Sequence, residues 1–195
     1  MAKSPTTRDA VVPVLAEAFR EHGYEGASMS VLQEASGLGR GSLYNFFPAG
    51  KEEMARAVLD DIRSWFAERV FAPLQAAAGG DRASAQAGVA AMLDEVDGYF
   101  RSGRRICLQG AFALGRERDR FAEAVGGYFS EWADALAAAL GASGAPEPRA
   151  LALRIVGAIQ GGIVLARALD DPGAFVAALD DARRAARVEV QTRKD

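Results

Sequence analysis

The chain has 195 residues, half of them apolar, and a net charge of −3. This composition supports a hydrophobic core and argues against disorder. One Cys and one His exclude an intrachain disulfide and a Cys/His zinc site, so we expect neither a metal nor any other cofactor.

The N-terminus lacks the apolar run of a signal peptide, and the most apolar window, residues 155–166, contains Gln160. That window is much shorter than the roughly twenty residues that cross a bilayer. We therefore expect a soluble, cytoplasmic protein with no membrane segment.

Apolar residues recur at helical spacing along the whole chain, and no alternating run typical of a strand is visible. The sequence therefore predicts an all-α protein. Gly79-Gly80 ends one helix, Asp81 can cap the next, and Pro13 predicts a kink in the first helix. The expected helices cover about residues 5–22, 29–35, 40–46, 51–77, 82–102, 107–114, 118–140, 148–169 and 170–190.

The most informative stretch is Gly37–Phe47, where a Gly-centred turn separates two short helical patterns. Two short helices joined by a tight turn form a helix-turn-helix, whose second helix enters the major groove of DNA. Leu38, Leu43 and either Phe46 or Phe47 supply inward anchors, whereas polar side chains with almost no acid among them face outward. These outward residues are Arg40, Ser42, Tyr44 and Asn45.

Apolar residues occupy every face of the helix expected at about residues 148–169, which predicts that it is buried on all sides. In a chain of this size, one face would pack against its own core and another against a second copy. Gly157, Gly161 and Gly162 would allow backbones to approach closely. We therefore expect a homodimer formed through residues 148–190.

The order of these motifs resembles that of the TetR-type transcriptional regulators over the first fifty-odd residues. The matching segments are Ala16–Phe19 at the start of the first helix, Gly23-Tyr24 at its end, Ser28 as the cap of the second, Ala35–Leu38 as the turn, Gly41–Phe46 as the recognition helix and Lys51–Met54 as the opening of the fourth helix. The run 47–52 is one residue longer than the usual linker and resembles the LmrA/YxaF-like branch.

The resemblance implies a three-helix helix-turn-helix DNA-binding domain in residues 1–50 and a helical effector-binding and dimerisation domain in residues 51–195. Two departures from the family pattern occur. Gly39 replaces the usual Ser or Thr cap, and Val31 stands where an Asp often completes the capping arrangement. A glycine cap costs only a few tenths of a kcal/mol relative to Ser, so folding is unaffected, but a hydroxyl that could reach a phosphate is lost.

Several residues are candidates for contact with double-stranded operator DNA. Guanidinium groups commonly bind guanine edges, so Arg40 is the expected base reader, while the Tyr44 hydroxyl and the Lys51 ammonium would bind phosphate. Plainer interpretations are a solvated Arg40, a packing aromatic at Tyr44, a surface charge at Lys51 and simple helix capping by Ser28. The complete set is Ser28, Arg40, Gly41, Ser42, Tyr44, Asn45 and Lys51.

Acidity counts against DNA binding. Residues 1–60 carry six Lys/Arg and eight Asp/Glu. Because affinity from counterion release grows with the number of phosphates neutralised, we expect weak non-specific binding and a reliance on specific contacts.

The later helices contain aromatic and polar residues that, by the same resemblance, would line an effector cavity. An ordinary aromatic core is the plainer interpretation. Tyr128, Trp132 and Gln160 are favoured because each carries a polar atom that a buried site must satisfy. Cys107, flanked by two arginines, could be a redox-sensing thiol or an inert buried one. The candidates are Trp65, Phe66, Phe100, Cys107, Phe112, Tyr128, Trp132 and Gln160.

No enzyme is indicated, because the only His lies far along the chain from Cys107 and the Gly-rich run of residues 157–162 follows no strand. We expect a ligand-responsive, homodimeric repressor that an apolar small molecule releases from a palindromic operator. Two alternatives remain open. One is a similar DNA binder without an effector, acting as an architectural or activating factor, and the other is a helical small-molecule carrier that no longer binds DNA.

Overall fold

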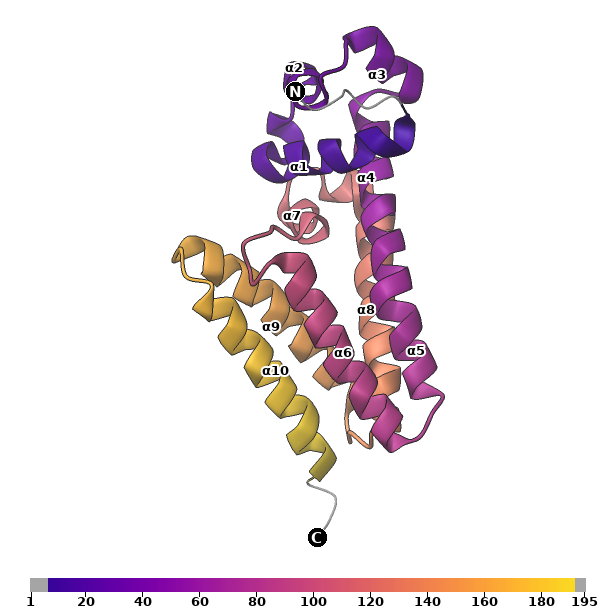
Figure 1. The fold of residues 1–195 in the computed structure, drawn as a ribbon, viewed down its shortest axis with the longest axis vertical. Coiled ribbons are helices and arrows are strands. Elements are labelled where there is room, and N and C mark those ends of the chain that lie inside the picture. The colour runs from indigo at the N-terminus through magenta and orange to yellow at the C-terminus, as the bar shows by residue number, and fades with distance from the viewer. Residues whose placement is uncertain (1–6, 192–195) are drawn as a thin grey trace. The chain divides into compact units, whose positions relative to one another are not determined.

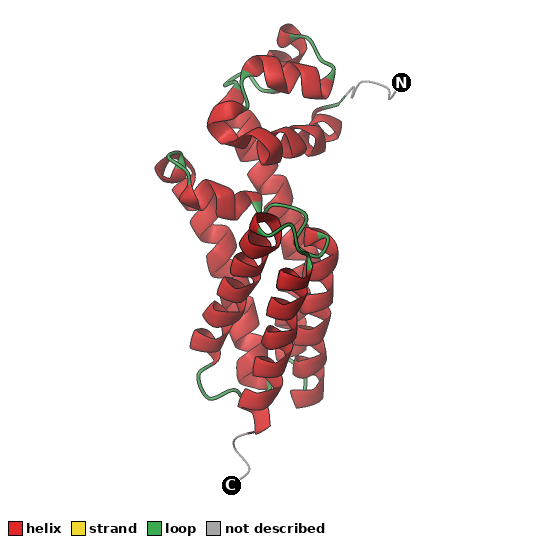
Figure 2. Ribbon diagram, turned by 90° about the vertical axis from the view of Figure 1, so that its left-hand side faces the viewer, coloured by secondary structure: helices red, strands yellow, loops and turns green. Residues whose placement is uncertain are grey.

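The structure is a computed structural model that describes residues 7–191, with side chains described through residue 186. Helices make up nearly all of this part of the chain, which contains no strand (Figure 2). The predicted all-α class is therefore confirmed. The chain forms two compact units: unit 1 holds the residues up to Ser64 together with Leu108–Gly126, and unit 2 holds Trp65–Cys107 and the residues from Gly127 onward.

Unit 1 contains the N-terminal helices and a short segment from the middle of the chain. Its elements are α1 (Arg8–Gly26), α2 (Met29–Ser36), α3 (Arg40–Phe46), most of α4 (Lys51–Phe66), α7 (Leu108–Leu114), the 3-10 turn η2 (Arg118–Phe121) and the start of α8 (Ala122–Ala142). The large apolar side chains of these elements form one core. Fully buried members are Leu15, Phe19, Leu32, Leu43, Phe47, Met54, Val58 and Phe121.

The first helix is regular through Pro13 and loses helical geometry only at Gly23, where φ is 67°. The kink expected at Pro13 is thus not where the helix breaks. Pro13 lies near the start of α1 and removes only one backbone donor, whereas Gly23 can adopt a positive φ without steric cost. The helix consequently turns at Gly23, and the chain enters α2 after Ser28.

Unit 2 is built from paired helices. It contains the end of α4, η1 (Ala67–Phe71), α5 (Ala72–Ala78), α6 (Arg82–Phe100), most of α8, α9 (Pro148–Ala168) and α10 (Gly173–Gln191). The last two helices run side by side as the orange and yellow pair in Figure 1, and α5 packs against α6. A Cβ atom added at Gly162 would lie 2.9 Å from the Cβ atom of Ala178, so glycine permits the close approach of α9 and α10.

The single helix expected for residues 51–77 contains a π-helical turn, Ala67–Phe71, between α4 and α5. Pro73 follows this turn. Proline has no backbone donor and its ring crowds the carbonyl four residues earlier, and a local π turn is one way in which a helix accommodates such a defect. Pro73 was therefore the sequence signal for this interruption.

The long helix α9 is apolar enough to cross a bilayer by length and composition alone. Eight of its residues are nevertheless buried within unit 2, among them Leu151, Ile155 and Ile159. Leu153, Val164 and Leu165 remain exposed in the single chain, so the burial of a second face against another copy stays a prediction. In this structure α9 is a core helix with one uncovered apolar face.

Candidate nucleic-acid interface and helical core site

The turn between α2 and α3 is held by short-range hydrogen bonds. Gly37 has a φ of 66° and ends α2. The buried Ser36 hydroxyl donates to the Leu32 carbonyl at 2.7 Å and accepts from the Leu38 amide at 3.4 Å. Sequence reasoning did not single out Ser36, although Ser at a helix end commonly bonds to nearby backbone. These contacts fix the angle at which α3 leaves α2.

Helix α3 buries its apolar anchor and exposes its polar residues. Leu43 is fully buried, while Arg40, Gly41, Ser42 and Asn45 are exposed. No acidic side chain occurs between Arg40 and Phe46. The expected outward face of the recognition helix therefore exists as a polar, acid-free surface.

Tyr44 has both packing contacts and partial exposure. It is half-buried, and the Arg40 guanidinium lies 5.5 Å from the centroid of its ring. A Cβ atom added at Gly50, where φ is 75°, would lie 3.5 Å from Tyr44 Cε1. The ring of Tyr44 is thus held against the turn that leads into α4.

Ser28 is exposed, and its hydroxyl accepts a hydrogen bond from the Val31 amide at 3.3 Å. This is the capping arrangement expected at the start of a helix. Gly39 precedes α3 without a side-chain cap, as its sequence predicts. The capping interpretation of Ser28 is accordingly satisfied by the geometry, and contact with a phosphate stays a prediction.

The ammonium of Lys51 has partners inside unit 1. Its Nζ atom donates to the Tyr24 carbonyl at 2.9 Å and lies 4.4 Å from the centroid of the Tyr24 ring. The Glu53 carboxylate accepts from the Ala49 amide at 2.8 Å, which places an acid at the start of α4. Lys51 therefore joins the end of α1 to the start of α4, and a phosphate would have to use its remaining donors.

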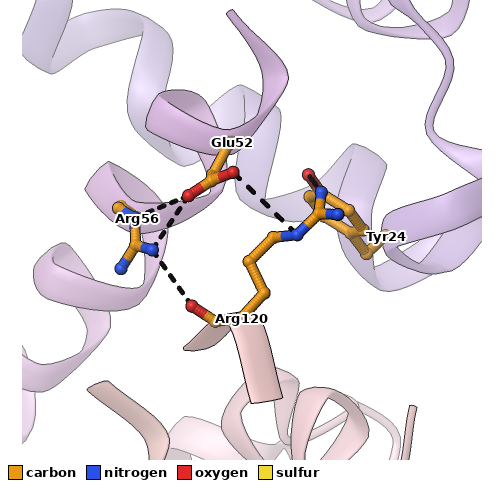
Figure 3. Close-up of polar contacts among 4 residues, drawn as sticks. All are labelled: Tyr24, Glu52, Arg56 and Arg120. Atoms are coloured by element: carbon orange, nitrogen blue, oxygen red, sulfur yellow. Dashed lines mark hydrogen bonds and ion pairs between the residues drawn. The ribbon is translucent and has the colours of Figure 1, made fainter. Parts of the chain in front are cut away.

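A polar junction that the sequence did not predict links α1, α4 and η2 (Figure 3). Arg120 Nη1 donates to Tyr24 Oη at 2.9 Å, and its Nε atom lies 3.9 Å from Glu52 Oε2. Arg56 Nη2 donates to Glu52 Oε1 at 2.9 Å and to the Arg120 carbonyl at 3.0 Å. The hydrogen bond to Tyr24 raises the pKa of Arg120 above its usual value. Since Tyr24 and Arg120 are 96 residues apart, no local pattern could have revealed this junction.

In unit 2, most of the predicted effector residues meet in one aromatic cluster around Phe66. Ring centroids of Trp65, Tyr128 and Trp132 lie 5.1, 5.1 and 5.4 Å from that of Phe66. The ring centroid of Phe100 lies 6.1 Å away. These distances are typical of favourable edge and tilted aromatic contacts.

Several polar atoms in unit 2 are buried without a hydrogen-bond partner among the described residues. They include Tyr128 Oη, Trp132 Nε1, Gln160 Nε2 and Asp97 Oδ1. Tyr128 and Trp132 are themselves fully buried. Burial, together with nearby Cys107 and Tyr99, raises the pKa of Tyr128 well above its usual value, so its hydroxyl stays protonated and can donate. Sequence reasoning selected the first three of these residues and missed Asp97.

One predicted effector residue, Phe112, has other surroundings. Phe112 lies in unit 1, where its ring centroid is 5.1 Å from that of Phe121 and 5.8 Å from that of Tyr24. The structure therefore separates Phe112 from the aromatic cluster of unit 2. Cys107 belongs to unit 2 and is a buried free thiol.

The sequence matches two known families over separate regions. Residues 14–58 match the bacterial regulatory proteins of the tetR family, and residues 85–181 match the C-terminal domain of LmrA/YxaF-like transcriptional regulators. The chain is 29% identical over 167 residues to the HTH-type transcriptional regulator LmrA of Bacillus subtilis, covering 82% of this chain and 85% of that protein. It is 30% identical over 182 residues to an uncharacterized HTH-type transcriptional regulator, Rv0196, of Mycobacterium tuberculosis, covering 84% and 86%.

Solved structures agree on the fold. A TetR-family regulator from Agrobacterium tumefaciens matches with a TM-score of 0.74 and 18% identity over 91% of this chain and 95% of that one. The regulator CifR, solved with a 26 bp double-stranded operator DNA, matches with a TM-score of 0.75 and 24% identity over 94% and 99%. These relatives are named as regulators and not as enzymes. The chain belongs to the TetR family of transcriptional regulators, in the branch with an LmrA/YxaF-like C-terminal domain.

Proposed function

We propose that this regulator is a cytoplasmic, homodimeric repressor that binds a palindromic operator and leaves it when an apolar small molecule binds. Residues 1–50 supply the DNA-binding part, and residues 51–195 supply the effector-binding and dimerisation part. The observation that carries the proposal is the exposed, acid-free polar face of α3 on a turn held by hydrogen bonds.

DNA recognition is assigned to α3 and its neighbours. Arg40 and Asn45 are exposed side chains of the kind that bind guanine and adenine edges. Ser42 and Tyr44 would bind phosphate, while Gly41 would let the backbone approach the groove. Ser28 and Lys51 remain proposed phosphate contacts at the starts of α2 and α4.

Dimerisation is assigned to the uncovered apolar face of α9 and α10. Leu153, Val164, Leu165, Leu169 and Val176 are 53, 58, 52, 65 and 42% exposed in the single chain. Isolated exposed apolar residues are common, but several on one helix pair indicate a surface that another molecule covers. A second copy would present the same face, as twofold dimers require.

The effector is assigned to the aromatic cluster of unit 2, with Trp65, Phe66, Phe100 and Cys107 as apolar lining. Tyr128, Trp132 and Gln160 offer donors that have no partner among the described residues. A buried donor without a partner is costly, so a ligand with acceptor oxygens would gain by pairing with them. Phe112 is left out because it lies in unit 1.

The energy required of the effector is modest. A differential affinity of about 1–3 kcal/mol between the two dimer states changes operator affinity about 5- to 150-fold. The chain continues from α4 directly into η1 of unit 2, so a change there can act on α4 through the backbone.

A gel shift with the DNA upstream of the protein's own gene tests the DNA-binding proposal. The Arg40→Ala, Tyr44→Phe double variant is expected to lose the shift while sedimenting as the wild type does. Arg82→Ala, which removes an exposed charge from the start of α6 in unit 2, serves as the matched control and is expected to bind normally. A wild-type protein that gives no shift at low salt would favour the small-molecule carrier.

The effector proposal is tested by melting shifts with a panel of lipophilic compounds. A compound that stabilises the protein is expected to release the DNA. Tyr128→Phe should weaken that compound's effect, since it removes only the hydroxyl. No stabilisation by any compound, with DNA binding intact, would support a regulator without an effector.

A further inference from the structure

We propose that Arg120 is a positioning residue for operator recognition. From η2 it sets the orientation of the end of α1 and the first turn of α4, and through them the place of Tyr44 on α3. The inference rests on the proposed DNA-binding function and assigns part of it to a residue outside the helix-turn-helix.

The segment Leu108–Gly126 carries Arg120 into unit 1, although both of its ends continue into unit 2. The segment is attached to unit 1 by buried aromatic side chains. The Phe121 ring centroid lies 5.1 Å from that of Tyr24, and the Phe112 ring centroid lies 6.2 Å from that of Phe19. These buried rings hold η2 at the end of α1, so the backbone of Arg120 has a fixed position there.

The Arg120 side chain then bonds to two helices at once. It donates to the Tyr24 hydroxyl on α1 and pairs with Glu52 on α4, while its carbonyl accepts from Arg56 on α4 (Figure 3). The Arg56 guanidinium also lies 5.3 Å from the centroid of the Phe121 ring. Three elements therefore meet in one polar junction, in which the Arg120 guanidinium contacts both Tyr24 on α1 and Glu52 on α4.

A continuous series of contacts leads from this junction to the recognition helix. The Tyr24 hydroxyl accepts a hydrogen bond from Arg120, and the Tyr24 carbonyl accepts one from Lys51 Nζ at 2.9 Å. Lys51 follows Gly50 in the chain, and the ring of Tyr44 packs against Gly50. A change in the orientation of Tyr24 would thus move the turn on which Tyr44 rests.

The charged side chains of the junction are partly exposed, which indicates that they orient the end of α1 and the first turn of α4 more than they stabilise the fold. The side chains of Arg120, Glu52 and Arg56 are 50, 42 and 46% exposed. Pairs of such exposed charges contribute little to folding free energy, because solvent screens them. The buried aromatic rings would keep unit 1 folded after Arg120 is replaced, so its loss should be visible in DNA recognition.

The test uses the full chain and an operator fragment that the wild-type protein selects from random duplex DNA. Arg120→Gln is expected to bind this fragment about five- to tenfold more weakly, within the range of coupling effects in proteins. Affinity for unselected duplex and the melting temperature should stay near wild type. Arg118→Gln is the matched control, since Arg118 is a neighbour on η2 whose ion pair is with Asp119.

A double-mutant cycle isolates the contact with Tyr24. Tyr24→Phe keeps the ring and should weaken operator binding, while the combination with Arg120→Gln should be no weaker than Arg120→Gln alone, because both remove one interaction. Arg120→Lys, which retains a donor and the charge, should recover part of the affinity.

Three outcomes overturn the inference. In the first, Arg120→Gln binds the operator as tightly as the wild type does. In the second, Arg120→Gln loses affinity for the operator and for unselected duplex equally, as the loss of a direct phosphate contact would cause. In the third, the effects of Tyr24→Phe and Arg120→Gln on operator affinity are additive. If the wild-type protein selects no sequence at all, the proposed DNA-binding function fails as well. If it does select one, each of these three outcomes counts against Arg120 alone.

Discussion

The amide nitrogen of Gln109 donates a hydrogen bond to the main-chain carbonyl of Leu59 at 3.0 Å. Gln109 is fully buried, and its own amide oxygen has no partner among the described residues. This bond joins α7 to α4 in the interior of unit 1, fifty residues apart in the chain.

Replacing Gln109 tests how much this interior bond stabilises unit 1. Gln109→Ala removes the bond and leaves a void, so the free energy of unfolding should fall by about 1–3 kcal/mol in urea titrations. Gln109→Met fills the same space and also removes the unpartnered oxygen, so it should cost less than Gln109→Ala. If both variants lose the same free energy of unfolding, the void left by Gln109→Ala does not contribute to the loss.

Charges on the uncovered face of α9 should break the dimer. Val164→Glu combined with Leu165→Glu places two carboxylates where we expect a second copy to pack, and desolvating them opposes association. Analytical ultracentrifugation should show a monomer with unchanged helical content. Leu114→Glu is the control, because Leu114 is 86% exposed and lies in unit 1. A double variant that remains dimeric would place the interface elsewhere.

Ser28→Asp separates helix capping from contact with phosphate. Aspartate caps a helix about as well as serine, so stability should be retained. A carboxylate beside a phosphate would repel it, so operator affinity should fall, most strongly at low salt where screening is weak. Unchanged affinity in a salt titration of the gel shift would leave Ser28 with capping as its only role.

Tyr128 should make the protein less stable in alkali. Its pKa is raised in the folded state by burial, so above about pH 10, where an unfolded tyrosine ionises, the unfolded chain binds fewer protons than the folded one. Stability is therefore complete below that pH and falls above it, with a slope approaching about 1.4 kcal/mol per pH unit. Tyr128→Phe should flatten this slope in urea titrations from pH 9 to 11, and an unaltered slope would contradict the assignment.

Local patterns in the sequence were sufficient for the helix-turn-helix and for the approximate bounds of most helices, though not for the break at Gly23 or the π turn of residues 67–71. Leu43 and Phe47 are fully buried and the polar residues of α3 face outward, as their spacing predicts. Helical periodicity and turn residues act over a few positions, so they can be read without the fold. The same holds for Gly37, whose positive φ ends α2.

Tertiary structure decided what lies far apart in the chain. It placed Phe112 with Tyr24 and Phe121 in unit 1, although its aromatic character fits an effector cavity equally well. It also gave Lys51 a carbonyl partner and brought Arg120 to Tyr24. Such contacts depend on how helices pack. The local sequence around a solvent-exposed arginine is the same whether or not a distant tyrosine contacts it in the folded chain.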